Sequence, residues 1–488
     1  MTNLKNILNG VYHKTLKGRE DIEIEDIKYD SRKVKENDIY VALIGSTNDG
    51  HDYILDAIKN GAKVIIISKL LEINEDVTVI KVDDTRIALS YMSMNYFDHP
   101  QSKLKLIAVT GTTGKTTTTH MIRDMLAFSN IECGLIGSQG IKYKNKVIET
   151  NNTTPESYEI QAAFRQMLDN GITHVVMEAS SQAFKMNRLA GMIFDIGVLT
   201  NVTSDHIGPN EHASHEEYVS CKNKMFLNSK EIISNSDSLY LDEVLKGVKE
   251  PITTYGIKNN ADLKVTEVHL INNTEFFGTE FKTEGLIKEN FKTGMPGEFN
   301  IYNSICAILV CYKLGVDIKK AKDALEKIKV RGRMEIALVT PKYKVLIDHA
   351  HTEDGMKCLV KTLRAYKPQR LISVFGGGGN RPKERRYNLG EIIGGASDFS
   401  IITMDNPRFE EISSINNDIK VGLDKVGAKY IEITDRADAI KYACKNAQEG
   451  DLILLVGKGH EEYQDVKGVK YYFSELDVIE DIKKNLKN

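Results

Sequence analysis

A glycine-bounded turn, GTTGKTT at residues 111–117, has the residue types that bind a polyphosphate. It follows an apolar run and precedes a helical stretch, so its backbone N–H groups and the helix start can hold phosphate oxygens. Lys115 would reach the β- and γ-phosphates, and the Thr116 hydroxyl would bind Mg²⁺. A strict P-loop has its first glycine where Val109 stands, so a structural helix start is the alternative. The predicted nucleotide-binding residues are Gly111, Thr112, Thr113, Gly114, Lys115, Thr116 and Thr117.

Two further apolar runs end in side chains that can bind a metal ion. Glu178 ends the run HVVME, and Asp205 and His206 follow the run VLTNV. In an open α/β sheet, the carboxyl ends of the strands form the ligand crevice. A carboxylate and an imidazole at that edge can bind a second metal ion between a nucleotide and an acidic acceptor. Polar loop residues without a ligand are the alternative.

Short strands that alternate with helices must position these residues, and they predict an α/β fold with a mostly parallel sheet. The breaker DHP at 98–100 sets one domain boundary, and the segment VRGR at 330–333 sets a second. We therefore expect three domains, at residues 1–100, 101–332 and 333–488. The predicted strands are 38–44, 63–68, 105–110, 173–177, 195–200 and 238–241, and the predicted helices are 53–59, 85–96, 115–128 and 299–314.

The last domain repeats the strand–helix rhythm and resembles a dinucleotide-binding, Rossmann-like fold in outline. Residues 376–379 are four consecutive glycines, and no G-x-G-x-x-G opens a helix there. The sequence therefore predicts no nicotinamide site. The strands expected in this domain are 343–348, 371–375, 399–403, 430–433 and 451–456.

Composition excludes several classes of protein. The 65 Lys and Arg against 68 Asp and Glu give a net charge of −3, which argues against a nucleic-acid binder. No apolar run approaches the ~18 residues of a membrane span, and the N-terminus lacks the pattern of a secretory signal. Six widely spaced cysteines are typical of reduced core thiols. We expect a cytoplasmic protein without nucleic-acid or membrane partners.

Several motifs occur in the order found in Mur ligases, and the chain resembles this family over nearly its whole length. Each motif alone is a weak signal, but their order across three domains is specific. They are DSRKV (30–34), GTTGKTT (111–117), NTTP (152–155), MEASSQ (177–182), TSDHIG (203–208), PGEFNIYN (296–303), GRME (332–335), DHAHT (348–352), DNPR (405–408) and GKGHE (457–461).

The resemblance implies an ATP-dependent amide ligase of peptidoglycan precursor synthesis. Such an enzyme transfers the γ-phosphoryl of ATP to a substrate carboxylate, and an amine then attacks the acyl phosphate. Here the expected acid is the D-Glu γ-carboxylate of UDP-MurNAc-L-Ala-D-Glu, and the expected amine is meso-diaminopimelate. The implied domains bind UDP-MurNAc (N-terminal), ATP (central, P-loop) and the amino acid (C-terminal). The implied cofactors are ATP, Mg²⁺ and a CO₂-derived carbamate on Lys222, and we expect a monomer.

The resemblance also assigns roles to individual residues. Lys115, Lys222 and His206 are implied in catalysis, and Thr116, Glu178, His206 and carbamylated Lys222 in metal binding. Implied nucleotide contacts outside the loop are Asn300, Asn303, Arg333 and Asp348. Implied contacts with the nucleotide-sugar substrate are Ser31, Arg32, Thr153, Thr154, Ser180 and Arg188. Implied contacts with the amino acid are Arg386, Asp405, Asn406, Pro407, Arg408, Gly457 and Glu461.

The motif DNPR implies selection of meso-diaminopimelate, because the Arg408 guanidinium can bind its distal carboxylate with two hydrogen bonds. Lysine-selecting relatives replace this arginine. GGGGN at 376–380, His349 and Phe409 depart from the usual family residues, so a sulfur-containing diamino diacid remains open as substrate. A folylpolyglutamate synthetase and a P-loop switch or motor are the other functions considered. The first lacks DNPR and the N-terminal domain, and the second needs no amine pocket.

Overall fold

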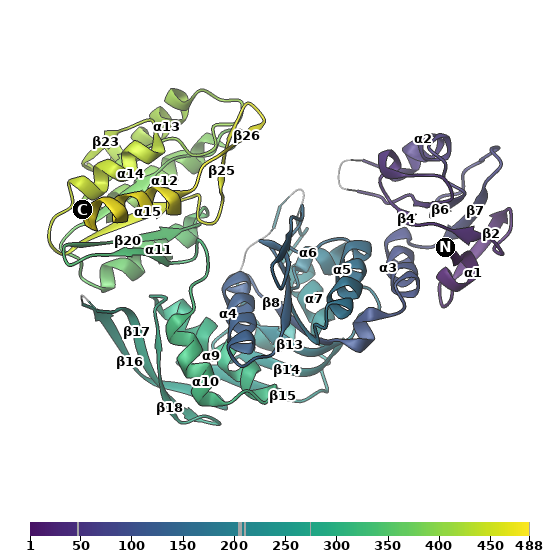
Figure 1. Ribbon diagram of the computed structural model, residues 1–488, viewed down its shortest axis with the longest axis horizontal. Helices are drawn as coiled ribbons and strands as arrows, with labels where there is room; N and C mark the ends of the chain where they lie inside the picture. Colours follow the sequence, from purple (N-terminus) through teal and green to yellow (C-terminus); the bar gives the residue numbers. More distant parts are fainter. Residues whose placement is uncertain (46–47, 204–206, 209–210, 274, 488) are drawn as a thin grey trace. The chain divides into compact units, whose positions relative to one another are not determined.

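The computed structural model describes residues 1–45, 48–203, 207–208, 211–273 and 275–487 (Figure 1). The chain forms two compact units. The first contains Met1–Lys264 and Ile305–Ala321, and the second contains Val265–Ser304 and Lys322–Asn488. Both units combine sheets with covering helices, which confirms the α/β fold class. The domain boundaries near residues 100 and 332 stay predictions.

The N-terminal part of the first unit is a five-stranded sheet of order β2-β7-β6-β5-β4 with helices on both faces (Figure 1). Ile39, Val64 and Ile66 pack under α1 and α3, whereas Tyr40 and Ile65 pack under α2, because neighbouring side chains of a strand point to opposite faces. The elements are β1 (Thr2–Asn3), α1 (Leu4–Ile7), β2 (His13–Lys17), β3 (Glu23–Ile24), β4 (Ile27–Lys28), β5 (Ile39–Val41), α2 (Ile54–Lys59), β6 (Val64–Ile67), β7 (Thr78–Val82) and α3 (Thr85–Tyr96).

The larger sheet of the first unit has the strand order β11-β10-β9-β12-β8-β13-β14-β15. In this order, the six strands β9, β12, β8, β13, β14 and β15 run parallel. β10 and β11 continue the sheet beyond β9 as antiparallel strands. The elements are β8 (Lys105–Thr110), α4 (Lys115–Phe128), β9 (Cys133–Gly137), β10 (Gly140–Tyr143), β11 (Lys146–Ile148), α5 (Ser157–Asp169), β12 (His174–Glu178), α6 (Ser181–Lys185), β13 (Phe194–Leu199), α7 (His215–Phe226), β14 (Ser229–Asn235), α8 (Leu241–Val244) and β15 (Ile252–Gly256).

The register of three central strands determines where the site residues lie. β8 pairs in parallel with β12 on one side and β13 on the other, with Glu178 beside Val109 and Leu199 beside Thr110. The carboxyl ends of all three strands therefore meet at one edge of the sheet. The phosphate loop after β8 lies between the turns that follow β12 and β13, which is the arrangement expected from the sequence.

One predicted strand is wrong. Residues 238–241 are an apolar run, but they form a turn that leads into α8, and the neighbouring strand is instead β14 (Ser229–Asn235). Leu239 is exposed, so the run does not cross the core. β14 is buried although it contains Lys230 and Glu231, whose charges lie at its beginning.

The C-terminal part of the second unit has a six-stranded sheet of order β19-β20-β24-β21-β22-β23, in which only β19 runs antiparallel among the described strands. The remaining elements of the chain are β16 (Leu263–Asn272), β17 (Phe277–Gly285), β18 (Glu289–Thr293), α9 (Glu298–Lys313), α10 (Ile318–Lys327), β19 (Glu335–Val339), β20 (Tyr343–Asp348), α11 (Glu353–Ala365), β21 (Leu371–Phe375), α12 (Lys383–Ala396), β22 (Phe399–Ile402), α13 (Ile412–Lys425), β23 (Tyr430–Glu432), α14 (Arg436–Lys445), β24 (Asp451–Val456), β25 (Tyr463–Val466), β26 (Val469–Tyr472) and α15 (Glu475–Lys487).

Two hydrophobic layers enclose this sheet. Helices α11, α12 and α13 cover one face with residues such as Leu363 and Ile419, and α14 and α15 cover the other with Ile440 and Ile479 (Figure 1). With both faces buried, the parallel strands are nearly continuous apolar runs, which is why the sequence predicted them well. Within the described ranges, no helix is long and apolar enough to span a bilayer.

Candidate active site

The phosphate loop in the first unit is shaped by two glycines. Gly111 has φ +153°, and a Cβ there would lie 1.9 Å from Thr200 Oγ1. Gly114 is the N-cap of α4 with φ +83°, a left-handed conformation that favours glycine. Among the described residues, no side chain caps the first amides of α4, so these donors face the loop as an anion site. Lys115 Nζ donates to the carbonyls of Gly111 at 2.7 Å and Thr112 at 3.0 Å, which holds its charge over the loop.

Three oxygen-bearing side chains meet at the start of α4. Thr116 Oγ1 lies 3.0 Å from Glu178 Oε2 and 3.1 Å from Ser138 Oγ. Glu178 is only 1% exposed, and its Oε1 accepts the backbone N–H of Ser138 at 2.9 Å. Gly137 leaves room for this carboxylate, because a Cβ there would lie 2.3 Å from Glu178 Oε1.

This oxygen cluster fits Mg²⁺, which prefers carboxylate and hydroxyl oxygen ligands and keeps several of its waters. In the part of the chain that the structure describes, no group of three or more His, Cys, Asp and Glu side chains forms a metal cage. A site of one carboxylate and hydroxyls, completed by phosphate oxygens, is the kind that Mg²⁺ accepts. The predicted ligand His206 lies outside the described residues.

Lys222 contacts Tyr218, and Tyr218 in turn contacts the phosphate loop. Its side chain, on α7, is 1% exposed, and its Nζ is 4.4 Å from the ring centre of Tyr218. The Tyr218 hydroxyl shares a hydrogen bond of 2.9 Å with Thr112 Oγ1 in the phosphate loop. Because its side chain is buried, Lys222 does not belong to a solvated helix face.

The residues predicted for the nucleotide-sugar substrate divide into two groups. Thr154 Oγ1 donates to the Glu178 carbonyl at 2.8 Å and accepts the Ser180 N–H at 3.0 Å. This group therefore adjoins the oxygen cluster of Thr116, Ser138 and Glu178. Arg188 Nη1 donates to the Thr154 carbonyl at 3.1 Å. Thr153 precedes Thr154 in the same segment and is partly exposed.

Ser31 and Arg32 form the second group and lie in a short helical turn of the N-terminal sheet. Ser31 is buried, and its carbonyl accepts Asn60 Nδ2 at 2.9 Å. The Arg32 guanidinium is exposed and pairs with Asp30 at 2.8 Å. No hydrogen bond in the described ranges links this turn to the phosphate loop.

Four predicted nucleotide contacts lie in the second unit. Asn300 and Asn303 are buried on α9, and Asn303 Nδ2 donates to Asn300 Oδ1 at 3.1 Å. Asp348 ends β20 and accepts the backbone N–H groups of Met334 and Ala350. Burial raises the pKa of the Asp348 carboxyl, and the charge of Arg333 opposes that rise.

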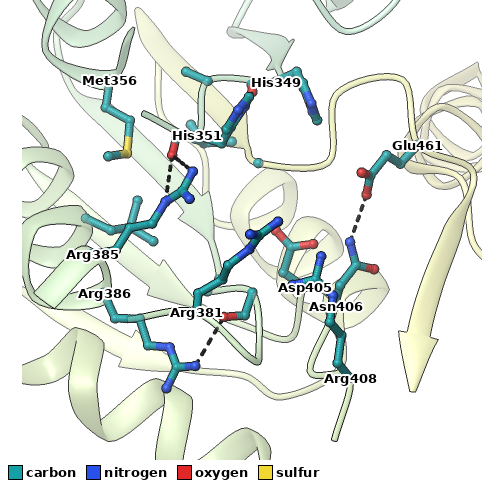
Figure 2. Close-up of a pocket in the computed structure, with 17 residues that line it drawn as sticks. His349, His351, Met356, Arg381, Arg385, Arg386, Asp405, Asn406, Arg408 and Glu461 are labelled. Carbon is teal, nitrogen blue, oxygen red and sulfur yellow. Dashed lines mark hydrogen bonds between the residues drawn. The ribbon is translucent and has the colours of Figure 1, made fainter. Parts of the chain in front are cut away.

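A pocket of about 220 Å³ lies at the carboxyl ends of four parallel strands of the second unit (Figure 2). Turns after β20, β21, β22 and β24 supply its walls. In Figure 2, Arg385 lies at one side of the pocket and Glu461 at the other, with Arg381 and Asp405 between them. The pocket therefore offers charges of both signs, as a zwitterionic ligand requires. The predicted residues among its lining are Arg386, Asp405, Asn406, Arg408, Gly457 and Glu461.

Pro407 and Arg408 continue the turn that begins at Asp405. Arg408 has φ +51°, which side chains with a Cβ rarely adopt. Its N–H donates to the Asp465 carbonyl at 2.9 Å, and its carbonyl accepts the Lys467 N–H at 2.7 Å. The guanidinium Nη1 donates to the Gly379 carbonyl at 2.7 Å. This backbone pairing with β25 holds the arginine at the pocket.

Arg386 is turned away from the ligand space. Its side chain is 2% exposed, and its guanidinium pairs with Asp418 at 2.9 Å and Glu410 at 2.7 Å. In Figure 2 the guanidinium points away from those of Arg381 and Arg385. With two carboxylate partners already in place, Arg386 ties α12 to α13 and to the Glu410 turn. Its role in amino-acid binding stays a prediction.

The sequence reasoning missed Arg381 and Arg385, which border the pocket. Arg385 donates to the His351 carbonyl, and no carboxylate in the described ranges pairs with it. Burial lowers the pKa of the Arg385 guanidinium, and the like charges of Arg381 and Arg408 lower it further. Three arginines that repel one another favour an anionic ligand. The run RPKERR at 381–386 was the available signal, but it does not say which arginine faces the pocket.

Three family models match consecutive parts of the chain. They are the Mur ligase family catalytic domain at residues 23–97, the Mur ligase middle domain at 109–311 and the Mur ligase glutamate ligase domain at 332–459. With full-length relatives at 40% identity, the chain belongs to the Mur ligase family. This confirms the resemblance drawn from the motifs. Members of this family use ATP and Mg²⁺.

The curated relatives include UDP-N-acetylmuramoyl-L-alanyl-D-glutamate–2,6-diaminopimelate ligases. One from Clostridium perfringens is 40% identical over 488 residues, which covers 98% of this chain and 99% of that protein. One from Clostridioides difficile is 36% identical over 484 residues, covering 97% and 98%. A solved structure of a ligase with the same name is 26% identical, with a TM-score of 0.72 and coverage of 100% and 99%.

More distant solved structures share the fold. A MurF ligase from Thermotoga maritima in complex with ADP has a TM-score of 0.58 at 18% identity, covering 95% of this chain and 98% of that one. A Mycobacterium tuberculosis folylpolyglutamate synthase has a TM-score of 0.58 at 16% identity. It covers 76% of this chain and 92% of that one, so part of this chain has no counterpart in it.

Proposed function

We propose that this protein is an ATP-dependent ligase that joins meso-diaminopimelate to the D-Glu γ-carboxylate of UDP-MurNAc-L-Ala-D-Glu. The product is a precursor of peptidoglycan. The observation that carries the proposal is that one chain contains both a phosphate loop beside a buried Glu178 and, in its other unit, a pocket lined by arginines and by the carboxylates of Asp405 and Glu461. The relatives from clostridia support the same two substrates by their names.

An amide does not form from a carboxylate at neutral pH unless the acid is activated. The γ-phosphoryl of ATP passes to the substrate carboxylate, which gives an acyl phosphate and ADP. The amine nitrogen then attacks the acyl carbon, the C–O bond to phosphate breaks, and the amine loses its proton. Lys115 neutralises charge on the phosphates, and the amides at the start of α4 orient them. Thr116 and Glu178 would hold Mg²⁺, which would supply further charge neutralisation.

The residues around Thr154 are suited to hold the acid substrate. Thr154 and Ser180 lie directly beside Glu178, so a carboxylate bound there would face the γ-phosphate. Arg188 adds a positive charge beside Thr154, where its Nε pairs with Glu156 at 3.0 Å. Ser31 and Arg32 would bind the uridine end. The family resemblance also implies nucleotide contacts from Asn300, Asn303, Arg333 and Asp348.

We also propose a carbamate on Lys222. A carbamate forms when the neutral amine of a lysine reacts with CO₂. The resulting carbamate would give an anionic oxygen for Mg²⁺ near the phosphate loop. Burial of Lys222 and its link to Thr112 through Tyr218 support this assignment.

Lys222→Ala should lower the ligation rate by about a hundredfold, the effect of losing one preorganised charge stabiliser. Acetate or formate should restore part of the rate, because a small carboxylate can occupy the space of the carbamate. The matched control is Lys224→Ala, since Lys224 lies on the exposed side of the same helix. Full activity of Lys222→Ala in CO₂-depleted buffer would contradict the carbamate.

The amino-acid pocket is suited to a ligand with charges of both signs. Arg408 would bind the distal carboxylate of meso-diaminopimelate, and Arg381 and Arg385 add positive charge to the same pocket. Glu461 would bind the distal ammonium. L-lysine lacks the distal carboxylate and would not make this contact with Arg408.

Ligation assays test the proposal directly. Purified protein, ATP, Mg²⁺ and UDP-MurNAc-L-Ala-D-Glu are incubated with meso-diaminopimelate, L-lysine or a sulfur-containing diamino diacid. We expect ADP and phosphate release only when both acid and amine are present, with meso-diaminopimelate preferred. ATP hydrolysis that needs neither substrate would instead support a P-loop switch. The protein is proposed to act as a monomer in the cytoplasm, without nucleic-acid or membrane partners.

A further inference from the structure

A lysine that the proposed reaction does not use is enclosed beside the amino-acid pocket. Lys458 lies in the turn after β24, and its side chain is 0% exposed. Water cannot solvate a buried ammonium, so it needs partners within the protein. Its Nζ lies 3.1 Å from Asn406 Oδ1, 3.4 Å from Asp405 Oδ1 and 3.5 Å from Glu461 Oε2.

Asn406 fixes the orientation of this cluster. Its Oδ1 accepts Lys458 Nζ and also the Asp465 N–H at 3.0 Å. The amide Nδ2 must therefore point the other way, and it donates to Glu461 Oε2 at 2.8 Å. One oxygen of Glu461 is thus held by two donors, Lys458 and Asn406.

Each of the two carboxylates keeps one oxygen that Lys458 does not hold. Within the described ranges, Asp405 Oδ2 and Glu461 Oε1 have no hydrogen-bond partner, and both residues line the pocket. Gly457 leaves space for the first of these oxygens, because a Cβ there would lie 2.7 Å from Asp405 Oδ2. The two oxygens are therefore available to a ligand.

The formal charges of the cluster add to −1, with Asp405 and Glu461 negative and Lys458 positive. A second buried pair beneath it, Arg436 and Glu475 at 2.7 Å, is neutral overall. Arg436 also donates to the Val456 carbonyl at 2.9 Å, just before the turn that carries Lys458. A charge of −1 matches one ammonium group.

We propose that Lys458 is a positioning residue that sets the acidic side of the pocket to accept one ammonium. It neutralises one of the two carboxylates and turns Asp405 Oδ2 and Glu461 Oε1 toward the ligand. This inference rests on the proposed function, since the distal end of meso-diaminopimelate carries one ammonium. It adds that the summed charge of Asp405, Glu461 and Lys458, and not Glu461 alone, determines how well the amine binds.

Two variants test the charge count. Asp405→Asn changes the formal charge of the cluster from −1 to 0, and Lys458→Met/Asp405→Asn returns it to −1. We expect Asp405→Asn to raise KM for meso-diaminopimelate about tenfold, as loss of a charged hydrogen-bond partner does. The double variant should bind meso-diaminopimelate better than Asp405→Asn, by up to about tenfold, although it carries one more substitution. KM for ATP should stay constant in both.

Lys458→Met alone would leave Asp405 Oδ1 without its donor and would remove the cation between two carboxylates, which destabilises folding. The decisive comparison therefore uses the double variant, in which the lysine and one carboxylate are removed together. The matched control is Lys470→Met. Lys470 Nζ lies 4.2 Å from the ring centre of Tyr463, which Lys458 also contacts at 5.6 Å, but Lys470 is exposed on β26.

Titration calorimetry with meso-diaminopimelate accompanies the ligation assay, so that binding is measured apart from turnover. A double variant that binds no better than Asp405→Asn would overturn the proposal, even if wild-type protein ligates meso-diaminopimelate. Suppose that the affinity for meso-diaminopimelate falls from wild type to the double variant to Asp405→Asn, but wild-type protein ligates nothing. The inference about the charge of the cluster then holds, and the proposed function fails.

Discussion

Lys115→Ala should lower the rate of phosphoryl transfer by at least about a thousandfold while the protein stays folded, by analogy with other preorganised charge stabilisers. Lys115 Nζ donates to the loop carbonyls of Gly111 and Thr112, which holds its charge over the phosphate loop. Its charge therefore serves the bound phosphates. The measurement is ADP release with both substrates present.

Lys105→Ala is the matched control for this variant. Lys105 begins β8, at the opposite end of the strand that leads into the phosphate loop, and it is partly exposed beside Asp195. We expect near-wild-type turnover from it. Near-normal turnover in a folded Lys115→Ala protein would contradict the assignment of the loop.

Arg408→Ala should lose most of its activity with meso-diaminopimelate. The ratio of kcat/KM between meso-diaminopimelate and L-lysine should therefore fall. The two amino acids differ by one distal carboxylate, and removing one partner of a buried guanidinium–carboxylate pair costs about 2–5 kcal/mol, or roughly thirty- to several-thousand-fold. Wild-type protein should prefer meso-diaminopimelate to L-lysine, because lysine has no distal carboxylate for the Arg408 guanidinium to bind. The measurement is kcat/KM for both amino acids.

ATP affinity should hardly change in this variant, since Arg408 lies in the amino-acid pocket. Lys467→Ala is the control, because Lys467 pairs with Arg408 through the backbone but its side chain is exposed. If wild-type protein prefers L-lysine, or if Arg408→Ala keeps its full discrimination, the selection by Arg408 is wrong and the ligase assignment is unaffected.

The sequence predicted the strands and helices that hold the phosphate loop with their observed bounds. β8 and α4 were predictable because one is a continuous apolar run and the other begins at Lys115 after a glycine turn. The strands β16 to β18 were missed. β16 has an exposed middle, so it lacks the buried apolar run that the prediction relied on. Residues 238–241 show the converse error, an apolar run that forms a turn.

The contact of Thr116 with Glu178 followed from the sequence because parallel strands end at one edge of a sheet. The contacts of Arg386 did not. Its partners Glu410 and Asp418 come from the turn after β22 and from α13, and no local pattern links them to α12. Lys458 was visible in GKGHE, but its burial depends on how three turns pack. Such pairings depend on tertiary structure.

The positive φ of Arg408 lowers the stability of the fold, while its side chain is proposed to select the amino acid. An L-residue in the left-handed region costs roughly 1–2 kcal/mol, and asparagine or glycine adopts this conformation with less strain. Selection for heat resistance alone should therefore replace Arg408, and the substituted protein would gain stability as it lost its hold on the distal carboxylate. The arginine persists at this position only while discrimination between amino acids matters to the cell. At this position, a substitution that raises thermal stability would thus lower the accuracy of amino-acid selection.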